Sequence, residues 1–380
     1  MSLDSYLPNY FLREIHYLAV RTTPAETYDA VCSFDMATVP WIAGLFRLRT
    51  VLDKQKPERF TLTLHDAYRN GGFIRLDEKA GEELTVGAIG KIWRPSIPFE
   101  KVAPEEYAEF HRPGFAKVAW SLRCEPRISQ GTLCSLEVRV GATDSISSAK
   151  MRSYYSLIGP FSRAIRRSVF RHFSRRFGDC FADESIRPLP GDPLIASPAG
   201  SITQSITIEA PPEAIWPWLL QMGCLRAGWY SYDWLDNAGV ASASVLVPEW
   251  QNVKEGDVFA ATPDDAGGFY VVSIDPLRHL ILGGCFDLDS HQAYDPGIDP
   301  LPSNYFRTTW AFVLEPQTSN VTRLITRARA DYLSNKTVTP HLRALLSRPV
   351  HTFMQRKQLV NLKRRSENLR AQMPKEPVPV

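Results

Sequence analysis

The segment RAGWYSYDWLDN, residues 226–237, combines four aromatic side chains with three charged ones in twelve positions. The aromatic residues fit neither one helical stripe nor one strand face, because Trp229 has the opposite strand parity to Tyr230, Tyr232 and Trp234. Tyrosine and tryptophan suit the rim of an apolar site, since each joins an apolar body to a polar tip. We therefore expect this segment to be an irregular, ligand-facing part of the chain.

The charged residues of the same segment add hydrogen-bonding chemistry. Arg226 can hold an anionic or carbonyl group of a ligand, and Asp233 or Asp236 can accept a proton. In the alternative interpretation, Arg226 pairs with one of these aspartates and the aromatic rings pack the corner of a core. The ligand-site interpretation predicts six binding residues: Arg226, Trp229, Tyr230, Tyr232, Asp233 and Asp236.

Other catalytic and cofactor patterns are missing from the sequence. The eight histidines have no metal-ligand spacing such as H-x-H or H-E-x-x-H, and no G-x-S-x-G motif marks a nucleophilic serine. His111 can act as an acid or base at a cavity mouth, or it can simply lie on a surface loop. We expect no metal and no cofactor, and the sequence identifies no catalytic residue.

The bulk composition is that of an ordinary globular protein. The 380 residues are 44% hydrophobic and 22% charged, and their number predicts two domains. The formal charge of +3 does not point to a nucleic-acid partner. The N-terminus lacks a signal-peptide pattern, and the uncharged stretch 214–225 is shorter than the ~20 residues that span a bilayer. We expect a cytoplasmic protein without stable membrane insertion.

The six cysteines are scattered and form no C-x-x-C pair, so neither a zinc knuckle nor a thioredoxin-type site is expected. Cys124 and Cys134 flank a predicted turn at 126–131 and can face each other across a hairpin. They are expected to be free thiols, as suits a reducing compartment, or else a disulfide pair.

Short patterns recur along the chain at a nearly constant spacing. Residues 24–28, PAETY, resemble residues 212–216, PEAIW, at an offset of 188. Two further pairs recur at offsets of 190 and 189: Trp120 with Trp310, and Pro160 with Pro349. A constant offset over such a distance predicts two copies of one domain.

The predicted domains cover residues 1–180 and 201–370. The segment 181–200 contains four prolines and is predicted to be a linker. Each copy has the same predicted order: a strand, a helix opened by a proline, several antiparallel strands and a long C-terminal helix. The candidate strands are 15–20, 75–86, 114–124 and 132–140 in the first copy, and 205–209, 268–273, 279–285, 308–314 and 321–330 in the second.

The long helices are expected to begin at Pro160 and Pro349. Apolar residues at every fourth position predict one buried stripe on the first of them: Phe161, Ile165, Val169, Phe173 and Phe177. The arginines of this helix, Arg166 among them, are expected on its solvated face, with a membrane or nucleic-acid surface as the alternative.

Charged residues also alternate along the late strands of both copies. Glu137 and Arg139 share one strand face, and Arg323 and Arg327 share another. We expect solvated outer faces with cross-strand ion pairs. The alternative is an inward face, where a buried charge needs a ligand or a partner.

This order of elements describes an α+β fold in which a curved antiparallel sheet wraps around a long helix, leaving room for an apolar hollow. The stretch ITIEAPPEAIWPWLLQMG (206–223) resembles the first strand and helix of the SRPBCC superfamily of START-like, helix-grip proteins. RAGWYSYDWLDN and VPEWQNVKEGDVF, within 226–259, resemble a bacterial branch of mostly undefined activity. VGAIGKIWRP (86–95) and YYSLIGPFSRAIRR (154–167) are similar to another bacterial domain of this type.

The resemblance implies two tandem helix-grip domains and places the aromatic-acidic segment beside a cavity mouth. The leading hypothesis is that the protein binds a small hydrophobic ligand, in a carrier or sequestration role. The alternative is a cyclase or dehydratase acting on a polyketide or isoprenoid-like substrate, which also needs a proton-transfer group in the hollow. Only the second copy carries the aromatic-acidic segment, so we expect the principal site there. The oligomeric state stays open.

Overall fold

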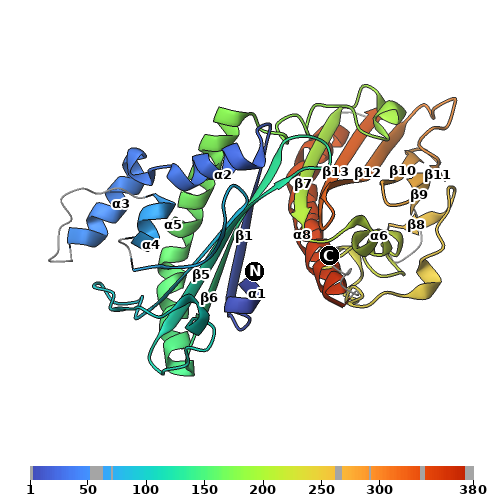
Figure 1. Cartoon of the computed structure of the whole chain (residues 1–380). Helices are drawn as coiled ribbons and strands as arrows, with labels where there is room; N and C mark the ends of the chain where they lie inside the picture. The colour runs from blue at the N-terminus through green and yellow to red at the C-terminus, as the bar shows by residue number, and fades with distance from the viewer. Residues whose placement is uncertain are drawn as a thin grey trace, which may run out of the picture. The chain divides into compact units, whose positions relative to one another are not determined.

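The computed structural model describes residues 3–51, 63–69, 72–261, 268–290, 292–333 and 339–372. The chain forms two compact units, of which the first ends at Phe181 and the second begins at Ala182. Each unit is an antiparallel sheet with a long helix packed against one face (Figure 1). The α+β architecture with two tandem helix-grip domains, expected from the sequence, is confirmed.

The first sheet has the strand order β1-β6-β5-β3-β2, with β4 paired to β3. The strands of this unit are β1 (Leu12–Val20), β2 (Ile74–Lys79), β3 (Glu83–Gly90), β4 (Phe99–Glu100), β5 (Ala116–Pro126) and β6 (Thr132–Ala142). Its helices are α1 (Leu3–Tyr6), α2 (Pro24–Ser33), η1 (Met36–Thr38), α3 (Pro40–Val51), α4 (Leu64–Arg69), η2 (Pro104–Glu106) and α5 (Ser145–Phe177).

The second sheet repeats this order as β7-β13-β12-β10-β9-β8, with β11 paired to β10. Its strands are β7 (Gly200–Ile208), β8 (Val258–Ala260), β9 (Gly268–Asp275), β10 (His279–Asp287), β11 (Ala293–Tyr294), β12 (Tyr305–Thr318) and β13 (Val321–Leu333). The helices are η3 (Asp192–Ile195), α6 (Pro212–Leu220), α7 (Asp233–Asp236), η4 (Pro248–Trp250) and α8 (Thr339–Gln372).

Local sequence signals explain where the helices begin. Thr23 and Glu26 form a reciprocal capping box ahead of α2, and Pro24 takes the first helical position. Asp144 caps α5 by accepting a hydrogen bond from the backbone nitrogen of Ser147 at 2.8 Å. These caps satisfy backbone donors that the first turn of a helix leaves free.

The predictions for one strand and for the starts of the two long helices are wrong. The single candidate strand 75–86 is two strands, β2 and β3, joined by a turn in which Gly81 has a φ of 78°. Pro160 and Pro349 lie inside α5 and α8 rather than at their first turns. Both helices therefore begin upstream of the proline that was expected to open them.

The predicted buried stripe of α5 is correct only in part. Val169 and Phe173 are buried, but Phe161 is 51% exposed, and Arg166, expected on the solvated face, is buried. A spacing of four drifts by about 40° per step relative to the 3.6-residue helical period, so five such residues cannot share one face. The residues of α5 that are buried follow the 3.6-residue period of the helix.

A segment that precedes the first strand covers the other face of each sheet. In the first unit, Asp4 pairs with Arg139 at 2.7 Å; in the second, Asp192 pairs with Arg329 at 3.0 Å. Asp4 and Asp192 are 188 positions apart, which is also the offset between β1 and β7. Arg139 and Arg329 are 190 positions apart, which is the offset between β6 and β13. Within the predicted linker, residues 181–200, Glu184, Leu189 and Asp192 thus contact the second sheet.

The charges on these strands are paired beneath the covering segments instead of being solvated. Arg139 contacts Glu137 at 2.6 Å. Arg323 contacts Glu184 at 2.8 Å, and Arg327 contacts Asp192 at 2.5 Å. Burial of these guanidinium groups requires such partners, because an unpaired buried charge is costly.

Cys124 and Cys134 are direct register partners across the β5–β6 hairpin, and both are free thiols. In the part of the chain that the structure describes, every helix is too short or too polar to cross a bilayer.

Candidate functional site

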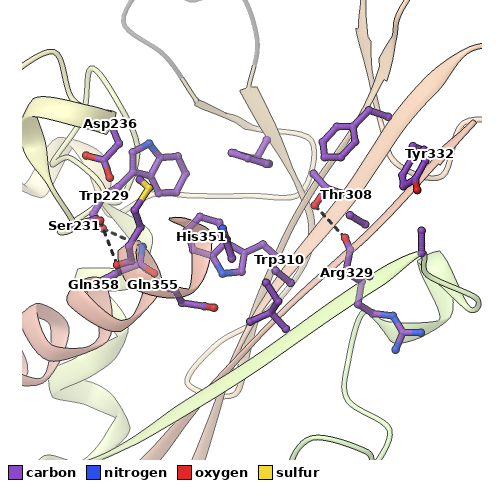
Figure 2. A pocket seen from close by; sticks show the side chains of 18 residues that line it. Trp229, Ser231, Asp236, Thr308, Trp310, Arg329, Tyr332, His351, Gln355 and Gln358 are labelled. Carbon is purple, nitrogen blue, oxygen red and sulfur yellow. Dashed lines mark hydrogen bonds between the residues drawn. The ribbon is translucent and has the colours of Figure 1, made fainter. Parts of the chain in front are cut away.

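The second unit contains a cavity of about 620 Å³ between its sheet and α8 (Figure 2). Its walls come from β7, β9, β12, β13, α8 and the segment that ends in α7. The lining residues are Ala199, Gly200, Ile202, Trp229, Ser231, Asp236, Phe269, Phe306, Thr308, Trp310, Ala328, Arg329, Ala330, Tyr332, His351, Met354, Gln355 and Gln358. This volume falls within the range of about 300–1,000 Å³ that is usual for small-molecule sites.

Small side chains open the cavity at the sheet. Gly200 pairs with Ala330 across β7 and β13, where the first unit pairs Leu12 with Val140 across β1 and β6. The next inward-facing pair is Ile202 with Ala328. At Gly200, Ala328 and Ala330 the side chain is smaller than its counterpart in the first unit, and strand register is unchanged.

Stacked aromatic rings form the apolar wall. Trp229 is 4% exposed; its ring stacks on Trp310 with centroids 5.4 Å apart and meets Phe269 edge-on at 5.8 Å. The His351 ring packs edge-on against Trp310, with ring centroids 5.6 Å apart. A flat apolar ligand can extend such a stack.

Two glutamines of α8 present carbonyl oxygens that lack partners among the described residues. Gln355 donates through Nε2 to Thr326 Oγ1 at 2.6 Å, and Gln358 donates through Nε2 to the Trp229 carbonyl at 3.0 Å. Their Oε1 atoms are buried and accept no hydrogen bond. A buried acceptor without a partner is costly, so these oxygens favour a ligand or water that donates to them.

Three further lining side chains hold buried polar atoms without a hydrogen bond in the described part of the chain. These atoms are Trp310 Nε1, His351 Nε2 and Asp236 Oδ1. Burial, followed by the negative charge of Asp233, raises the pKa of Asp236 to about 6. Burial lowers the pKa of His351, which keeps its imidazole neutral at neutral pH. The cavity thus combines donors and acceptors with an apolar wall.

The positive charge in the wall is already neutralised. Arg329 is the single Lys or Arg among the described lining residues. Its guanidinium points away from the cavity, pairs with Asp192 and donates to the carbonyls of Ile195 and Ala196, each at 3.0 Å (Figure 2). An anionic ligand group therefore finds no uncommitted Lys or Arg among the described residues of this wall.

The structure separates the six residues that the sequence predicts as a site. Trp229 and Asp236 line the cavity. Arg226, Tyr230, Tyr232 and Asp233 are described residues but are not part of its lining. They lie behind the wall or at its outer edge.

Arg226 is held by backbone carbonyls and an aromatic ring, and it is not among the described residues that line the cavity. Its guanidinium lies 4.6 Å from the centre of the Phe259 ring and donates to the carbonyls of Leu220 (2.9 Å) and Trp250 (3.2 Å). The side chain thus ties three backbone segments together, where the sequence pattern suggested a ligand contact or an aspartate partner.

The remaining predicted residues have structural contacts. The Tyr230 hydroxyl accepts a hydrogen bond from Gln221 Nε2 at 3.0 Å, and burial raises its pKa. Tyr232 stacks on Phe353, with ring centroids 4.7 Å apart. Asp233 accepts a hydrogen bond from Ser242 Oγ. His111, another candidate, is exposed in the first unit and lies outside this cavity.

Sequence reasoning missed the contribution of α8. Four buried positions of α5 recur on α8 at the offset of 189: Arg166, Val169, Phe170 and Phe173 correspond to Gln355, Gln358, Leu359 and Leu362. The repeat could have revealed the two glutamines, because the same offset joins Pro160 to Pro349. Without the repeat, a glutamine in a helix rich in charged residues is predicted to be exposed to solvent.

Comparisons with known proteins add a fold-level likeness. No family model matches the chain, and no curated protein matches it significantly. The di-domain aromatase/cyclase BexL aligns over 94% of this chain and 99% of its own, with 12% identity and a TM-score of 0.23. The Zhui aromatase/cyclase from a Streptomyces species covers 44% of this chain and 94% of its own, with 10% identity and a TM-score of 0.22.

A conserved protein from Geobacillus kaustophilus covers 44% of this chain and 96% of its own, with 13% identity and a TM-score of 0.25. Solved structures with such low identities and TM-scores give no information about which residues of this chain bind a ligand. The fold assignment rests on the strand order and helix placement of the chain itself.

Proposed function

We propose that the second unit binds a small, largely apolar, uncharged molecule in the cavity between its sheet and α8, in a carrier or sequestration role. The observation that carries this proposal is the lining itself. Aromatic and aliphatic surface surrounds buried polar atoms of Asp236, Trp310, His351, Gln355 and Gln358 that have no partner among the described residues. Such an arrangement orients a ligand through a few hydrogen bonds while apolar contact supplies most of the affinity.

Of the six residues predicted from the sequence, we propose Trp229 and Asp236 as ligand contacts. Trp229 supplies stacking surface and Asp236 supplies a hydrogen bond. Arg226, Tyr230 and Tyr232 are proposed to support the wall through the contacts described above.

A neutral apolar dye such as N-phenyl-1-naphthylamine tests the proposal. Ala328→Trp fills the cavity from β13 and is expected to weaken dye binding at least about tenfold. Ala241→Trp adds the same side chain on an exposed loop outside the lining and serves as the matched control. Equal binding by both folded variants, measured by fluorescence titration, would place the site elsewhere.

A second candidate function is a cyclase or dehydratase on a polyketide or isoprenoid-like substrate. Asp236 favours it, because a carboxyl group with a pKa of about 6 can both take and give a proton near neutral pH. The neutral imidazole of His351 lines the same cavity and can also exchange a proton with a bound substrate. Mass spectrometry of the molecule released from the purified protein separates the two functions. A carrier returns its ligand unchanged, whereas the enzyme converts it and loses turnover in Asp236→Asn.

A further inference from the structure

Helix α5 of the first unit has a one-sided charge. Its 33 residues, Ser145–Phe177, include eight lysines and arginines and no aspartate or glutamate. Helices on protein surfaces usually mix both signs, since opposite charges one turn apart stabilise the helix. This composition is a cost for an isolated helix, and it calls for compensation by something outside the helix.

Part of that charge is compensated within the unit. Arg163 contacts Glu14 of β1 at 2.6 Å, and Arg166 also binds Glu14. Arg167, Arg171 and Arg175 are exposed, and among the described residues no hydrogen bond or ion pair reaches their guanidinium groups. Their spacing of four places them along one side of the helix, over about 12 Å of its axis.

Two adjoining hollows, of about 470 and 460 Å³, run along this side of the helix and share Ser168 and Arg171. One is also lined by Val39 and Arg175, and the other by Trp41 and Arg167. The guanidinium groups therefore border a continuous depression, which can accommodate anionic groups.

The same side of α5 carries apolar side chains at its other end. Leu157 is 70% exposed and Phe161 is 51% exposed. Trp41, which lines one hollow with Arg167 and Arg171, is 41% exposed. Leu157 and Phe161 are one turn apart, and together with Arg167, Arg171 and Arg175 they fall within an arc of about 120° around the helix axis. We call this surface, comprising Trp41, Leu157, Phe161, Arg167, Arg171 and Arg175, the basic-apolar face.

We propose that the basic-apolar face docks on an anionic phospholipid surface. Its arginines attract lipid phosphates, and its Trp, Phe and Leu side chains can enter the boundary between headgroups and acyl chains, which is the composition of an interfacial helix face. A nucleic acid offers phosphates but no apolar layer for Leu157 and Phe161. No described helix can span a bilayer, so the contact is peripheral. The proposal does not depend on the cavity of the second unit.

Co-sedimentation of the full chain with lipid vesicles tests this. We expect binding to phosphatidylcholine vesicles that contain phosphatidylglycerol, weak binding to pure phosphatidylcholine, and loss of binding as salt rises. The triple change Arg167→Gln, Arg171→Gln and Arg175→Gln should weaken binding about 100-fold, since each basic side chain near an anionic surface contributes about fivefold. The corresponding triple change to lysine should retain most of the binding.

A matched control removes three exposed cations from α8 of the second unit: Arg356→Gln, Lys357→Gln and Arg364→Gln. It lowers the net charge equally and should bind vesicles like the wild type. Equal loss in both triple variants would overturn the proposal, as would failure of the wild-type protein to bind anionic vesicles. Binding to a DNA or RNA oligonucleotide but not to vesicles would also overturn it. Circular dichroism confirms that each variant is folded.

Discussion

The two units share their strand order and the buried positions of their long helices, yet they fill the space between sheet and helix differently. In the first unit, Glu14 of β1 accepts hydrogen bonds from Tyr155, Arg163 and Arg166 of α5. In the second, the position of Glu14 is Ile202 and the position of Arg166 is Gln355. A buried ionic network in one unit thus corresponds to a cavity wall in the other.

This difference shows that the helix-grip fold does not depend on a full interior. Register in the second sheet is set by backbone pairing and by the layer of side chains on its other face, where Leu189 and Leu194 of the covering segment pack. The residues on the face of the sheet that lies toward the long helix can therefore differ between the two units. Small residues such as Ala328 and Ala330 leave a cavity, while Val138 and Val140 at the same positions in the first unit fill it.

The largest expected effect comes from breaking the ionic network of the first unit. Glu14→Ala leaves Arg166 buried with one partner fewer and should lower the free energy of unfolding by about 3–5 kcal/mol. The double variant Glu14→Ile with Arg166→Gln installs the second unit's residues and should be more stable than Glu14→Ala. Urea denaturation followed by circular dichroism measures both, with exposed Glu105→Ala as the control.

The effect of Glu14 also has a defined pH dependence. Burial alone would raise its pKa, but hydrogen bonds from Arg163 and Tyr155 and the charge of Arg166 lower it overall. The folded-state pKa lies below the unfolded value of about 4.3, so the contribution is complete above that pH and is lost as the pH falls. If the difference in the free energy of unfolding between wild type and Glu14→Ala stayed constant down to strongly acidic pH, it would contradict this account.

Much of the fold was accessible from the sequence because the two copies share anchors. Trp120 and Trp310 occupy equivalent strand positions, as the constant offset predicted. The stripe on α5 failed at Phe161 and Arg166, because a spacing of four imitates a helical face only over two turns. No pattern in the sequence showed that Arg166 is buried, since its partner Glu14 lies about 150 residues away.

The site was less accessible for a related reason. The aromatic-acidic segment is conspicuous in composition, but composition cannot tell whether a ring faces the cavity or the core behind it. Tyr230 and Trp229 are neighbours, and a positive φ of 58° at Tyr230 helps to send their side chains to different surroundings. The glutamines of α8 come from a helix more than 100 residues further along the chain, and only the folded sheet brings them to Trp229.

The next expected effect concerns the cavity wall. Ala328→Val with Ala330→Val gives the second unit the first unit's residues and should weaken binding of an apolar dye about tenfold or more, without loss of stability. The reciprocal change Val138→Ala should destabilise the first unit by about 2 kcal/mol, because it removes packed carbon atoms. Fluorescence titration and thermal melting measure the two effects. Unchanged dye affinity in the double variant would contradict the proposed site.

A smaller effect is expected at Asp236, which has no counterpart in the ionic network of the first unit. Its folded-state pKa of about 6 exceeds the unfolded value of about 3.9, so the folded protein holds a proton that the unfolded chain releases. The free energy of unfolding should therefore fall as the pH rises from about 4 to 6 and then level off. Because Asp236 is only partly buried, we expect about 1 kcal/mol.

Asp236→Asn removes this titration and should flatten the stability profile between pH 4 and 8, leaving the variant more stable than the wild type at pH 8. Denaturation curves at several pH values check the difference between the two proteins. A variant that follows the wild-type profile would show that Asp236 titrates normally.

The smallest effect is expected at Tyr232, at the outer edge of the wall. Its ring stacks on Phe353 and lies outside the described cavity lining. Tyr232→Leu keeps an apolar side chain but loses the ring stacking, which should cost about 0.5 kcal/mol of stability and change dye affinity less than about twofold. Trp229→Leu, three residues earlier, removes a ring from the wall and should weaken the dye about tenfold. If Tyr232→Leu lowered dye affinity as much as Trp229→Leu does, the ligand would extend past the α8 wall to Phe353. Tyr232 would then contact the ligand and would not merely support the wall.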